Sequence, residues 1–207
     1  AFARLSSWRD GEPRRPEPTL VVTGTGSGKT EAFLYPILDH CRRDNRPGIK
    51  ALILYPMNAL ANDQAARLAE LITGDPALQG IRAGLYTGES EGNRTTVSDA
   101  GLITDRATLR DAPPDILLTN YKMLDQLLLR DADAPLWEQS ATTLQYVALD
   151  EFHTYDGAQG TDVALLLRRM GLRLKAMQPE GFLHPDERDR PLGRITPVAT
   201  SATLGDR

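Results

Sequence analysis

The sequence predicts an α/β fold in which helices flank a mostly parallel central sheet. Short apolar runs of strand length alternate with longer segments of helical periodicity, the order of elements that produces a parallel sheet. The chain has 207 residues, of which 41% are hydrophobic and 25% are charged. This length and composition are typical of one globular domain, and they leave too little chain for two full α/β domains.

Local patterns predict the elements of the N-terminal half. Pro36 lies inside an expected helix and is expected to kink it. Asn58 is a residue type that caps helices, so we expect it to cap the helix that follows it. The expected elements are a helix at 2–10, a proline-broken loop at 11–18, a buried strand at 20–22, a glycine loop at 23–28, a helix from 29 to about 43, a buried strand at 51–55, a helix from 58 and a strand at 81–86.

The C-terminal half continues the alternation. A long helix is expected from about 161 to 177, because Val163, Leu166 and Met170 recur at helical spacing. Three prolines and many charges at 178–194 indicate a surface loop. The other expected elements are a polar, partly helical stretch at 88–114, a strand at 115–119, a helix at 121–130, a strand at 145–149 and a last strand at 195–200.

Charge and cysteine content narrow the functional classes. The formal net charge of −4 argues against a basic protein that coats nucleic acid, although it allows a basic strip on one face. The single cysteine, Cys41, can form neither an internal disulfide nor a cysteine zinc cluster, so we expect a reducing, cytoplasmic setting. The longest apolar runs have about five residues, too few to span a membrane, and no signal peptide pattern opens the chain. Because the chain starts without Met and already in helical rhythm, we expect it to be cut from a longer protein.

Residues 23–30 have the composition of a phosphate-binding loop. They read Thr-Gly-Thr-Gly-Ser-Gly-Lys-Thr between an expected strand and an expected helix. Small residues let backbone N–H groups close around a phosphate, and the helix N-terminus adds partial positive charge. Lys29 can then reach the β and γ phosphates, and Thr30 can place its hydroxyl on Mg²⁺. The strict pattern has Gly where this chain has Thr23, and a glycine-rich turn that binds nothing is the structural alternative.

An acidic motif follows the strand expected at 145–149. It reads Asp150, Glu151, Phe152 and His153, and ligands bind α/β sheets at the carboxyl ends of strands. One carboxylate can hold Mg²⁺, and the next can orient or deprotonate an attacking water. Two adjacent carboxylates repel each other unless a cation lies nearby, and a solvated strand end is the alternative interpretation.

These two motifs and the segments around them resemble the first RecA-like domain of superfamily 2 helicases of the DEAD/DEAH-box type. The resemblance spans residues 19–205, with 23–38 similar to motif I and its helix and 150–153 similar to motif II in its DExH form. The other matching segments are the motif Ia position at 55–61, a glycine motif at 86–88, an element equivalent to the TPGR motif of the DNA helicases at 114–124 and motif III at 201–205.

The resemblance implies that residues 1–207 are one half of a two-domain P-loop motor. The Q motif that reads adenine would lie upstream, and motifs IV to VI, with the arginine finger, belong to a second RecA-like domain of the same protein. The chain alone is therefore expected to bind ATP weakly and to hydrolyse it negligibly. Residues 153–170 are similar to the large bacterial DExH helicases with a cysteine-rich C-terminal domain, which include DNA-repair helicases and those of phage-defence systems such as Druantia and DISARM. Further repair or defence subunits are then expected as partners.

The same resemblance assigns the nucleotide site. Asp150 and Thr30 are expected to hold Mg²⁺, Glu151 to position the lytic water, and His153 to link the nucleotide to motif III and the partner domain. The expected ATP ligands are Thr23, Gly24, Thr25, Gly26, Ser27, Gly28, Lys29 and Thr30.

The resemblance also assigns a face to DNA, either single-stranded or at a junction with duplex. Backbone N–H groups and short polar side chains at strand ends would contact phosphates there without reading sequence. The expected contacts are Pro56, Met57, Asn58, Thr87, Gly88, Thr119 and Asn120, with Ser201, Ala202 and Thr203 coupling this face to the nucleotide. Trp8 and Trp137 are expected to pack the domain edge rather than to stack on bases.

The expected activity is ATP-driven movement on DNA by a helicase or translocase. A double-strand translocase that does not unwind would use the same residues, and RNA stays open as a substrate because backbone contacts carry no base readout. A nucleotide-gated scaffold for partner enzymes is the alternative from another class. The presence together of Lys29, Asp150 and Glu151 argues against a scaffold, which has no need of all three.

Overall fold

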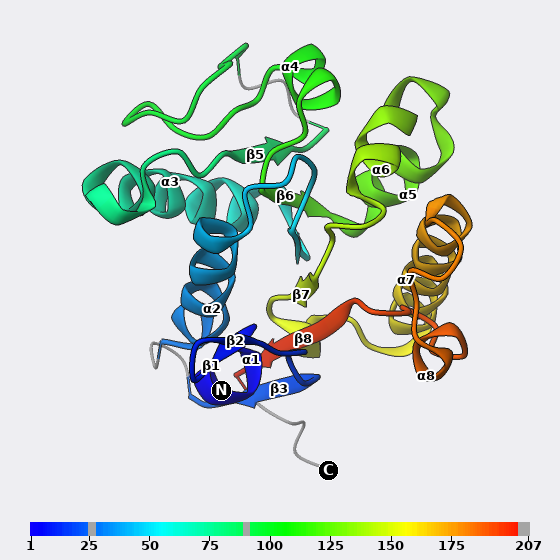
Figure 1. Ribbon diagram of the computed structural model, residues 1–207. Helices are drawn as coiled ribbons and strands as arrows, with labels where there is room; N and C mark the ends of the chain where they lie inside the picture. The colour runs from blue at the N-terminus through cyan, green and yellow to red at the C-terminus, as the bar shows by residue number, and fades with distance from the viewer. Residues whose placement is uncertain (25–27, 89–91, 203–207) are drawn as a thin grey trace.

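A parallel sheet forms the centre of the structure, a computed structural model that describes residues 1–24, 28–88 and 92–202 (Figure 1). Within those residues the sheet has six strands, and all neighbouring strands in it are parallel. The order across the sheet is β3 (Thr19–Val22), β8 (Thr196–Ser201), β7 (Tyr146–Leu149), β4 (Ala51–Tyr55), β6 (Ile116–Asn120) and β5 (Ala83–Tyr86). The α/β fold predicted from the sequence is thereby confirmed.

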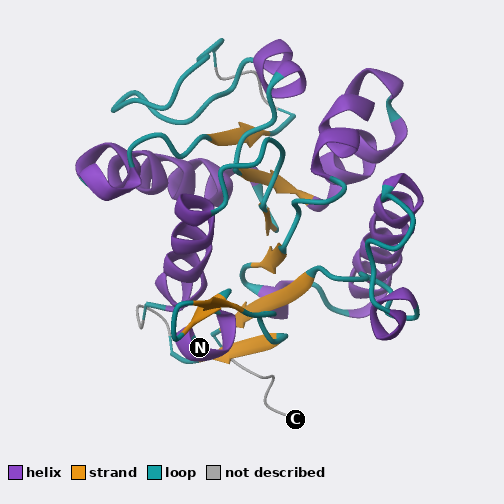
Figure 2. Ribbon diagram, viewed as in Figure 1, coloured by secondary structure: helices purple, strands orange, loops and turns teal. Residues whose placement is uncertain are grey.

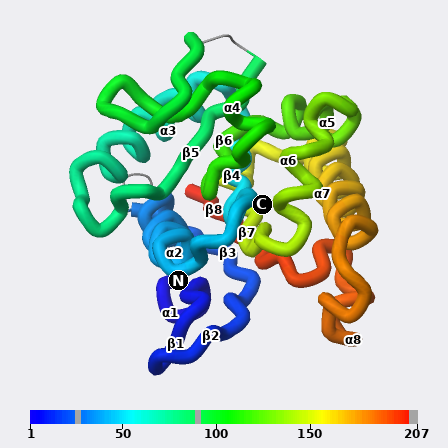
Figure 3. The backbone as a smooth tube through the Cα atoms, turned by 45° about the horizontal axis from the view of Figure 1, so that its top comes forward, coloured from blue at the N-terminus to red at the C-terminus, as the bar shows by residue number. Residues whose placement is uncertain are grey.

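Helices cover both faces of this sheet (Figure 2). Figure 3 shows α2 (Lys29–Arg43) and α3 (Asn58–Gly74) on one side of the strands, and α5 (Tyr121–Leu129), α6 (Ala134–Ser140) and α7 (Gly157–Met177) on the other. The shorter elements are α1 (Phe2–Leu5), β1 (Trp8–Arg9), β2 (Glu12–Pro13), α4 (Arg106–Asp111), α8 (Pro185–Arg188) and the 3-10 turns η1 (Pro76–Leu78), η2 (Asp131–Asp133) and η3 (Phe152–Thr154). None of the helices in the described part of the chain is long and apolar enough to cross a membrane.

Two apolar cores hold the layers together, one on each face of the sheet. In β4, Leu52 and Leu54 join the core under α5, α6 and α7, whereas Ile53 joins the core under α2 and α3. Because both faces of this strand are buried, its sequence is apolar without alternation. Cys41 lies in the α2 and α3 core, where burial raises the pKa of its thiol well above the usual value.

The N-terminal segment differs from the prediction. The helix expected at 2–10 ends at Leu5, and Trp8–Arg9 then pairs antiparallel with Glu12–Pro13. Asp10 and Gly11 connect the two strands with positive φ angles of 53° and 85°. An Asp-Gly pair favours this two-residue hairpin turn, so a hairpin at this position could have been predicted from the sequence.

Other boundaries shift for identifiable reasons. Leu20 and Val22 are exposed because β3 is an edge strand, so the prediction of a fully buried strand there was wrong. The long helix α7 begins at Gly157 rather than near residue 161, and α6 was not predicted. The expected loop at 178–194 contains the short helix α8.

Candidate functional site

The residues of both sequence motifs meet at the carboxyl end of the sheet. In the parallel pairing of β3 with β8, Val22 lies beside Ser201, and in the pairing of β7 with β8, Leu149 lies beside Ala199. The loop after β3, the acids after β7 and the last residues of β8 therefore share one end. This is the end at which open α/β sheets bind their ligands.

Gly28 sets the backbone at the start of α2. Its φ of +78° lies in the left-handed region, which a residue with a side chain adopts only with strain. Lys29 and Thr30 then form the first turn of the helix, so their side chains and backbone N–H groups stand where a helix attracts anions. Of the other loop residues, Thr23 donates its N–H to the carbonyl of Ser201 over 3.3 Å, and Gly24 is exposed. The expected ligands Thr25, Gly26 and Ser27 lie outside the described residues.

Lys29 is a buried cation beside a carboxylate. Its side chain is 7% exposed, and its Nζ lies 3.6 Å from Oε1 of Glu151. Among the described residues this ammonium has no hydrogen-bond partner. A buried ammonium without hydrogen bonds costs free energy, so the position is suited to an anionic ligand that would complete it.

Asp150 is a buried carboxylate, with an exposed fraction of 3%. Its Oδ2 lies 3.4 Å from the hydroxyl of Thr30, and its Oδ1 accepts from the N–H of Glu151 over 3.1 Å. Hydroxyl and carboxylate oxygens are ligands that Mg²⁺ accepts, usually with phosphates and waters completing the shell. The pair Thr30 and Asp150 therefore fits the expected magnesium ion.

Glu151 adopts an unusual backbone conformation. Its φ of 51° is left-handed, which for a residue other than glycine costs about 1–2 kcal/mol. Its N–H donates to Asp150 and, over 3.2 Å, to the hydroxyl of Thr200, so the neighbours hold the strained conformation in place. Its Oε2 is buried without a hydrogen bond among the described residues and lies 3.4 Å from Nδ1 of His153. The carboxylate thus stands between Lys29 and the imidazole.

Thr200 is a site residue that the motif reading missed. It is fully buried, and its hydroxyl donates to Oδ1 of Asp150. The signal lay in the register, because parallel pairing of Leu149 with Ala199 places the next residues, Asp150 and Thr200, beside each other. Of the expected coupling residues, Ser201 is buried at the end of β8 and Ala202 follows it, whereas Thr203 lies outside the described residues.

The residues expected to contact nucleic acid lie at the same end of the neighbouring strands. Pro56, Met57 and Asn58 follow β4, Thr87 and Gly88 follow β5, and Thr119 and Asn120 end β6. Since β4, β6 and β5 are adjacent in that order, the structure brings these three groups together.

The side chains of this set differ in how much of their surface is exposed to solvent. Met57 is 63% exposed, whereas Thr119 is fully buried and donates its hydroxyl to the carbonyl of Tyr86 over 2.6 Å. Asn58 does not cap its helix, as had been predicted. Instead, its Oδ1 accepts from Nδ2 of Asn120 over 2.6 Å, and Asn120 caps α5 through the N–H of Met123. The Asn58–Asn120 bond connects the ends of two neighbouring strands, and the hydroxyl of Thr119 bonds within the sheet.

A ring contact joins the acidic segment to this second group. Tyr155 follows η3, is buried, and meets Tyr121 edge to face with ring centroids 6.0 Å apart. Burial, with a contribution from the charge of Asp150, raises the pKa of Tyr155 well above its usual value. Tyr121 is the first residue of α5, so the contact connects the segment after Glu151 to the element that Asn120 caps.

The chain is similar to proteins of known sequence and structure, helicases among them. Druantia protein DruE of Escherichia coli (strain UMEA 4076-1) is 28% identical over 90% of this chain, and ATP-dependent helicase hrq1 of Schizosaccharomyces pombe is 33% identical over 73% of it. The aligned regions make up 15% and 13% of those two proteins. The crystal structure of the DUF1998 helicase MrfA bound to DNA and AMPPNP matches 92% of this chain and 22% of its own, with 28% identity and a TM-score of 0.67. This chain therefore spans less than a quarter of each relative.

The match to a family model covers nearly the whole chain. The model for DEAD/DEAH box helicases matches residues 12–207, which include both motifs and all six strands of the main sheet within the described residues. The chain belongs to the DEAD/DEAH box helicase family.

Proposed function

We propose that residues 1–207 are the first RecA-like domain of a helicase or translocase that couples ATP hydrolysis to movement on DNA. The observation that carries the proposal is the group formed by Lys29 and Thr30 at the start of α2 with Asp150 and Glu151 after β7. There a buried ammonium that has no hydrogen-bond partner among the described residues lies beside the Glu151 carboxylate, and the Thr30 hydroxyl lies beside Asp150. The phosphates of a triphosphate would pair with the ammonium of Lys29, and its divalent cation would pair with the carboxylate of Asp150.

The chain's own residues have separable roles in this reaction. The start of α2 would bind the β and γ phosphates through backbone N–H groups and through Lys29. Thr30 and Asp150 would hold Mg²⁺, which when bound offsets charge on the phosphate oxygens. Lys29 would exchange its contact with Glu151 for one with phosphate, leaving that carboxylate to orient a water and accept its proton. His153, 3.4 Å from Glu151, would limit the positions of the carboxylate.

The nucleic-acid substrate belongs to the proposal as well. A nucleic-acid backbone would cross the carboxyl ends of three adjacent strands, which carry Pro56, Met57, Asn58, Thr87, Gly88 and Asn120. DNA is favoured because the solved structure of MrfA contains DNA and AMPPNP together. The length of the relatives supports a second RecA-like domain in the full protein. The one cysteine is buried, in keeping with a cytoplasmic setting.

The test is the ATPase activity of the full protein with and without single-stranded DNA. We expect Lys29→Ala and Glu151→Gln each to lower the DNA-stimulated rate at least about a hundredfold. Glu138→Gln, which neutralises an exposed carboxylate on α6, is the matched control and should keep the rate. Retained turnover in both site variants would refute the proposal. Strand displacement and triplex displacement, each on DNA and RNA, then distinguish unwinding from translocation.

A further inference from the structure

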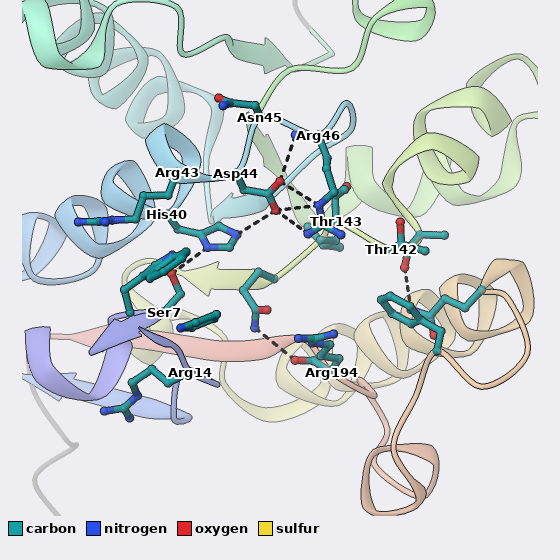
Figure 4. A pocket seen from close by; sticks show the side chains of 17 residues that line it. Ser7, Arg14, His40, Arg43, Asp44, Asn45, Arg46, Thr142, Thr143 and Arg194 are labelled. Atoms are coloured by element: carbon teal, nitrogen blue, oxygen red, sulfur yellow. Dashed lines mark hydrogen bonds and ion pairs between the residues drawn. The ribbon is translucent and has the colours of Figure 1, made fainter. Parts of the chain in front are cut away.

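A cavity of about 550 Å³ lies at the amino end of the sheet, where β4, β7 and β8 begin (Figure 4). Its walls come from the β1–β2 hairpin, the last turn of α2 and the segments that lead into β7 and β8. The volume is within the range of small-ligand sites. Because the strands are parallel, this cavity lies at the opposite end from Lys29 and Asp150.

The lining is strongly cationic. It contains the guanidinium groups of Arg14, Arg43, Arg46 and Arg194 but a single carboxylate, Asp44. The lining residues thus carry three more positive charges than negative ones, in a chain with a net charge of −4. Arg14 pairs with Glu17 and Arg43 with Asp39, two carboxylates that do not line the cavity. A concentration of arginines in a concave site favours an anionic ligand.

Two of these arginines, Arg43 and Arg194, lie against aromatic rings, and neither has a carboxylate that pairs with it alone among the described residues. Asp44 is engaged by Arg46 at 2.5 Å. Arg43 shares the carboxylate of Asp39 with a second arginine, and its guanidinium lies 5.4 Å from the centre of the Trp8 ring. Arg194 lies 5.7 Å from the centre of the Phe182 ring, and no carboxylate of the described residues pairs with it. Aromatic support of this kind orients the planar fork that binds carboxylates with two hydrogen bonds.

Two buried polar atoms in the wall have no hydrogen-bond partner among the described residues, although one of them, Nε2 of His40, lies 3.9 Å from Oδ2 of Asp44. One is Nε2 of His40, a residue that is 8% exposed and whose Nδ1 lies 2.9 Å from the hydroxyl of Ser7. The other is Oε1 of Gln178, whose Nε2 donates to the carbonyl of Ala141 over 2.6 Å. Buried polar groups are normally hydrogen-bonded, so Oε1 of Gln178 points to a missing ligand. An oxygen acceptor such as Oε1 needs a donor, which carboxylate and phosphate groups do not supply.

We propose that this cavity binds an acidic peptide segment. Carboxylates of the segment pair with Arg43 and Arg194, and a backbone N–H of the segment donates to Oε1 of Gln178. A second cavity of about 510 Å³ shares the lining residues Asp44, Asn45 and Arg46 with the first. Nucleic acid fits less well, because each aromatic ring already stacks against a guanidinium and the wall adds unpaired acceptors.

The test is fluorescence anisotropy of the full protein with a labelled peptide rich in glutamate, compared with the same peptide carrying glutamine. We expect the glutamate peptide to bind and the glutamine peptide to bind at least about tenfold more weakly. The double variant Arg43→Gln/Arg194→Gln should lose at least about tenfold in affinity for the glutamate peptide. The matched control Arg130→Gln, at an exposed arginine beyond the end of α5, should not.

Other outcomes would overturn the proposal. These are absence of binding, equal affinity for both peptides, an unchanged double variant, or tighter binding of oligothymidylate with the same dependence on Arg43 and Arg194. The variant Lys29→Ala separates this inference from the proposed function, because it should leave peptide binding unchanged even if ATP turnover is lost.

Discussion

Replacing Thr200 with valine removes one hydroxyl from the proposed nucleotide site and almost nothing else. Valine has the shape of threonine, so the packing of β8 between β3 and β7 is kept. The lost hydroxyl is a donor to Asp150 and an acceptor for the N–H of Glu151, and no solvent reaches it because Thr200 is fully buried.

The size of the effect follows from those two bonds. A hydrogen bond to a charged group contributes about 1.5–3 kcal/mol, and a neutral one contributes about 1 kcal/mol. We therefore expect Thr200→Val to lower the free energy of unfolding by about 2–4 kcal/mol. Thr200→Ser keeps the hydroxyl and loses one buried methyl group, which costs about 1 kcal/mol.

Urea unfolding of the wild type and both variants measures this order. In the full protein, ATP turnover should also fall in Thr200→Val, by about tenfold to a hundredfold, because Glu151 is no longer fixed. The reasoning fails if the valine variant unfolds at the wild-type urea concentration, or if the serine variant is the less stable of the two.

Three further predictions use other parts of the structure. Lys29→Met should abolish binding of a fluorescent ATP analogue and lower the stability of the nucleotide-free protein by about 1–3 kcal/mol, because the Glu151 carboxylate loses the cation beside it; an unchanged urea midpoint would contradict this. Gly171→Ala should lower stability by about 1–3 kcal/mol, because a Cβ would lie 2.2 Å from the carbonyl oxygen of Pro191. Gly74→Ala, with nothing within 4 Å, is its control and should cost no stability. Burial lowers the pKa of His40 from 6.5 to about 4, so the folded protein holds its imidazole neutral while the unfolded chain takes up a proton. Stability is therefore unaffected by this group above pH 6.5 and falls by up to about 3 kcal/mol as the pH decreases toward 4. His40→Gln should reduce that slope in unfolding curves measured across this range, and an identical slope would show that other groups cause it.

Long buried elements could be predicted because their signals are local. The helix Lys29–Arg43 begins where predicted, directly after the left-handed Gly28. The strand Ala51–Tyr55 has the predicted boundaries because it is buried on both faces and therefore apolar throughout. The short elements could not be predicted as well. The helix expected at 2–10 gave way to a hairpin, and α6 follows Asp133, whose buried carboxylate pairs with Arg110 from a distant segment.

The candidate site shows the same division. Lys29, Thr30, Asp150 and Glu151 could be found from the sequence, because phosphate and magnesium chemistry requires those residue types after two strands. Thr200 and the partner of Asn58 could not, since their contacts depend on which strands are neighbours and in what register. The roles in catalysis and in nucleic-acid binding stay predictions until the variants are measured.

The burial of Cys41 allows fluorescent dyes to be attached at chosen positions of the protein. It is the one thiol in the sequence, it is buried, and its raised pKa leaves little reactive thiolate at neutral pH. A cysteine introduced at Met57 or Asn45, both exposed, would therefore take a maleimide dye selectively without removal of the native one. Dyes at these two positions would report from opposite ends of the strands, so nucleotide and peptide binding could be followed independently in the same molecule.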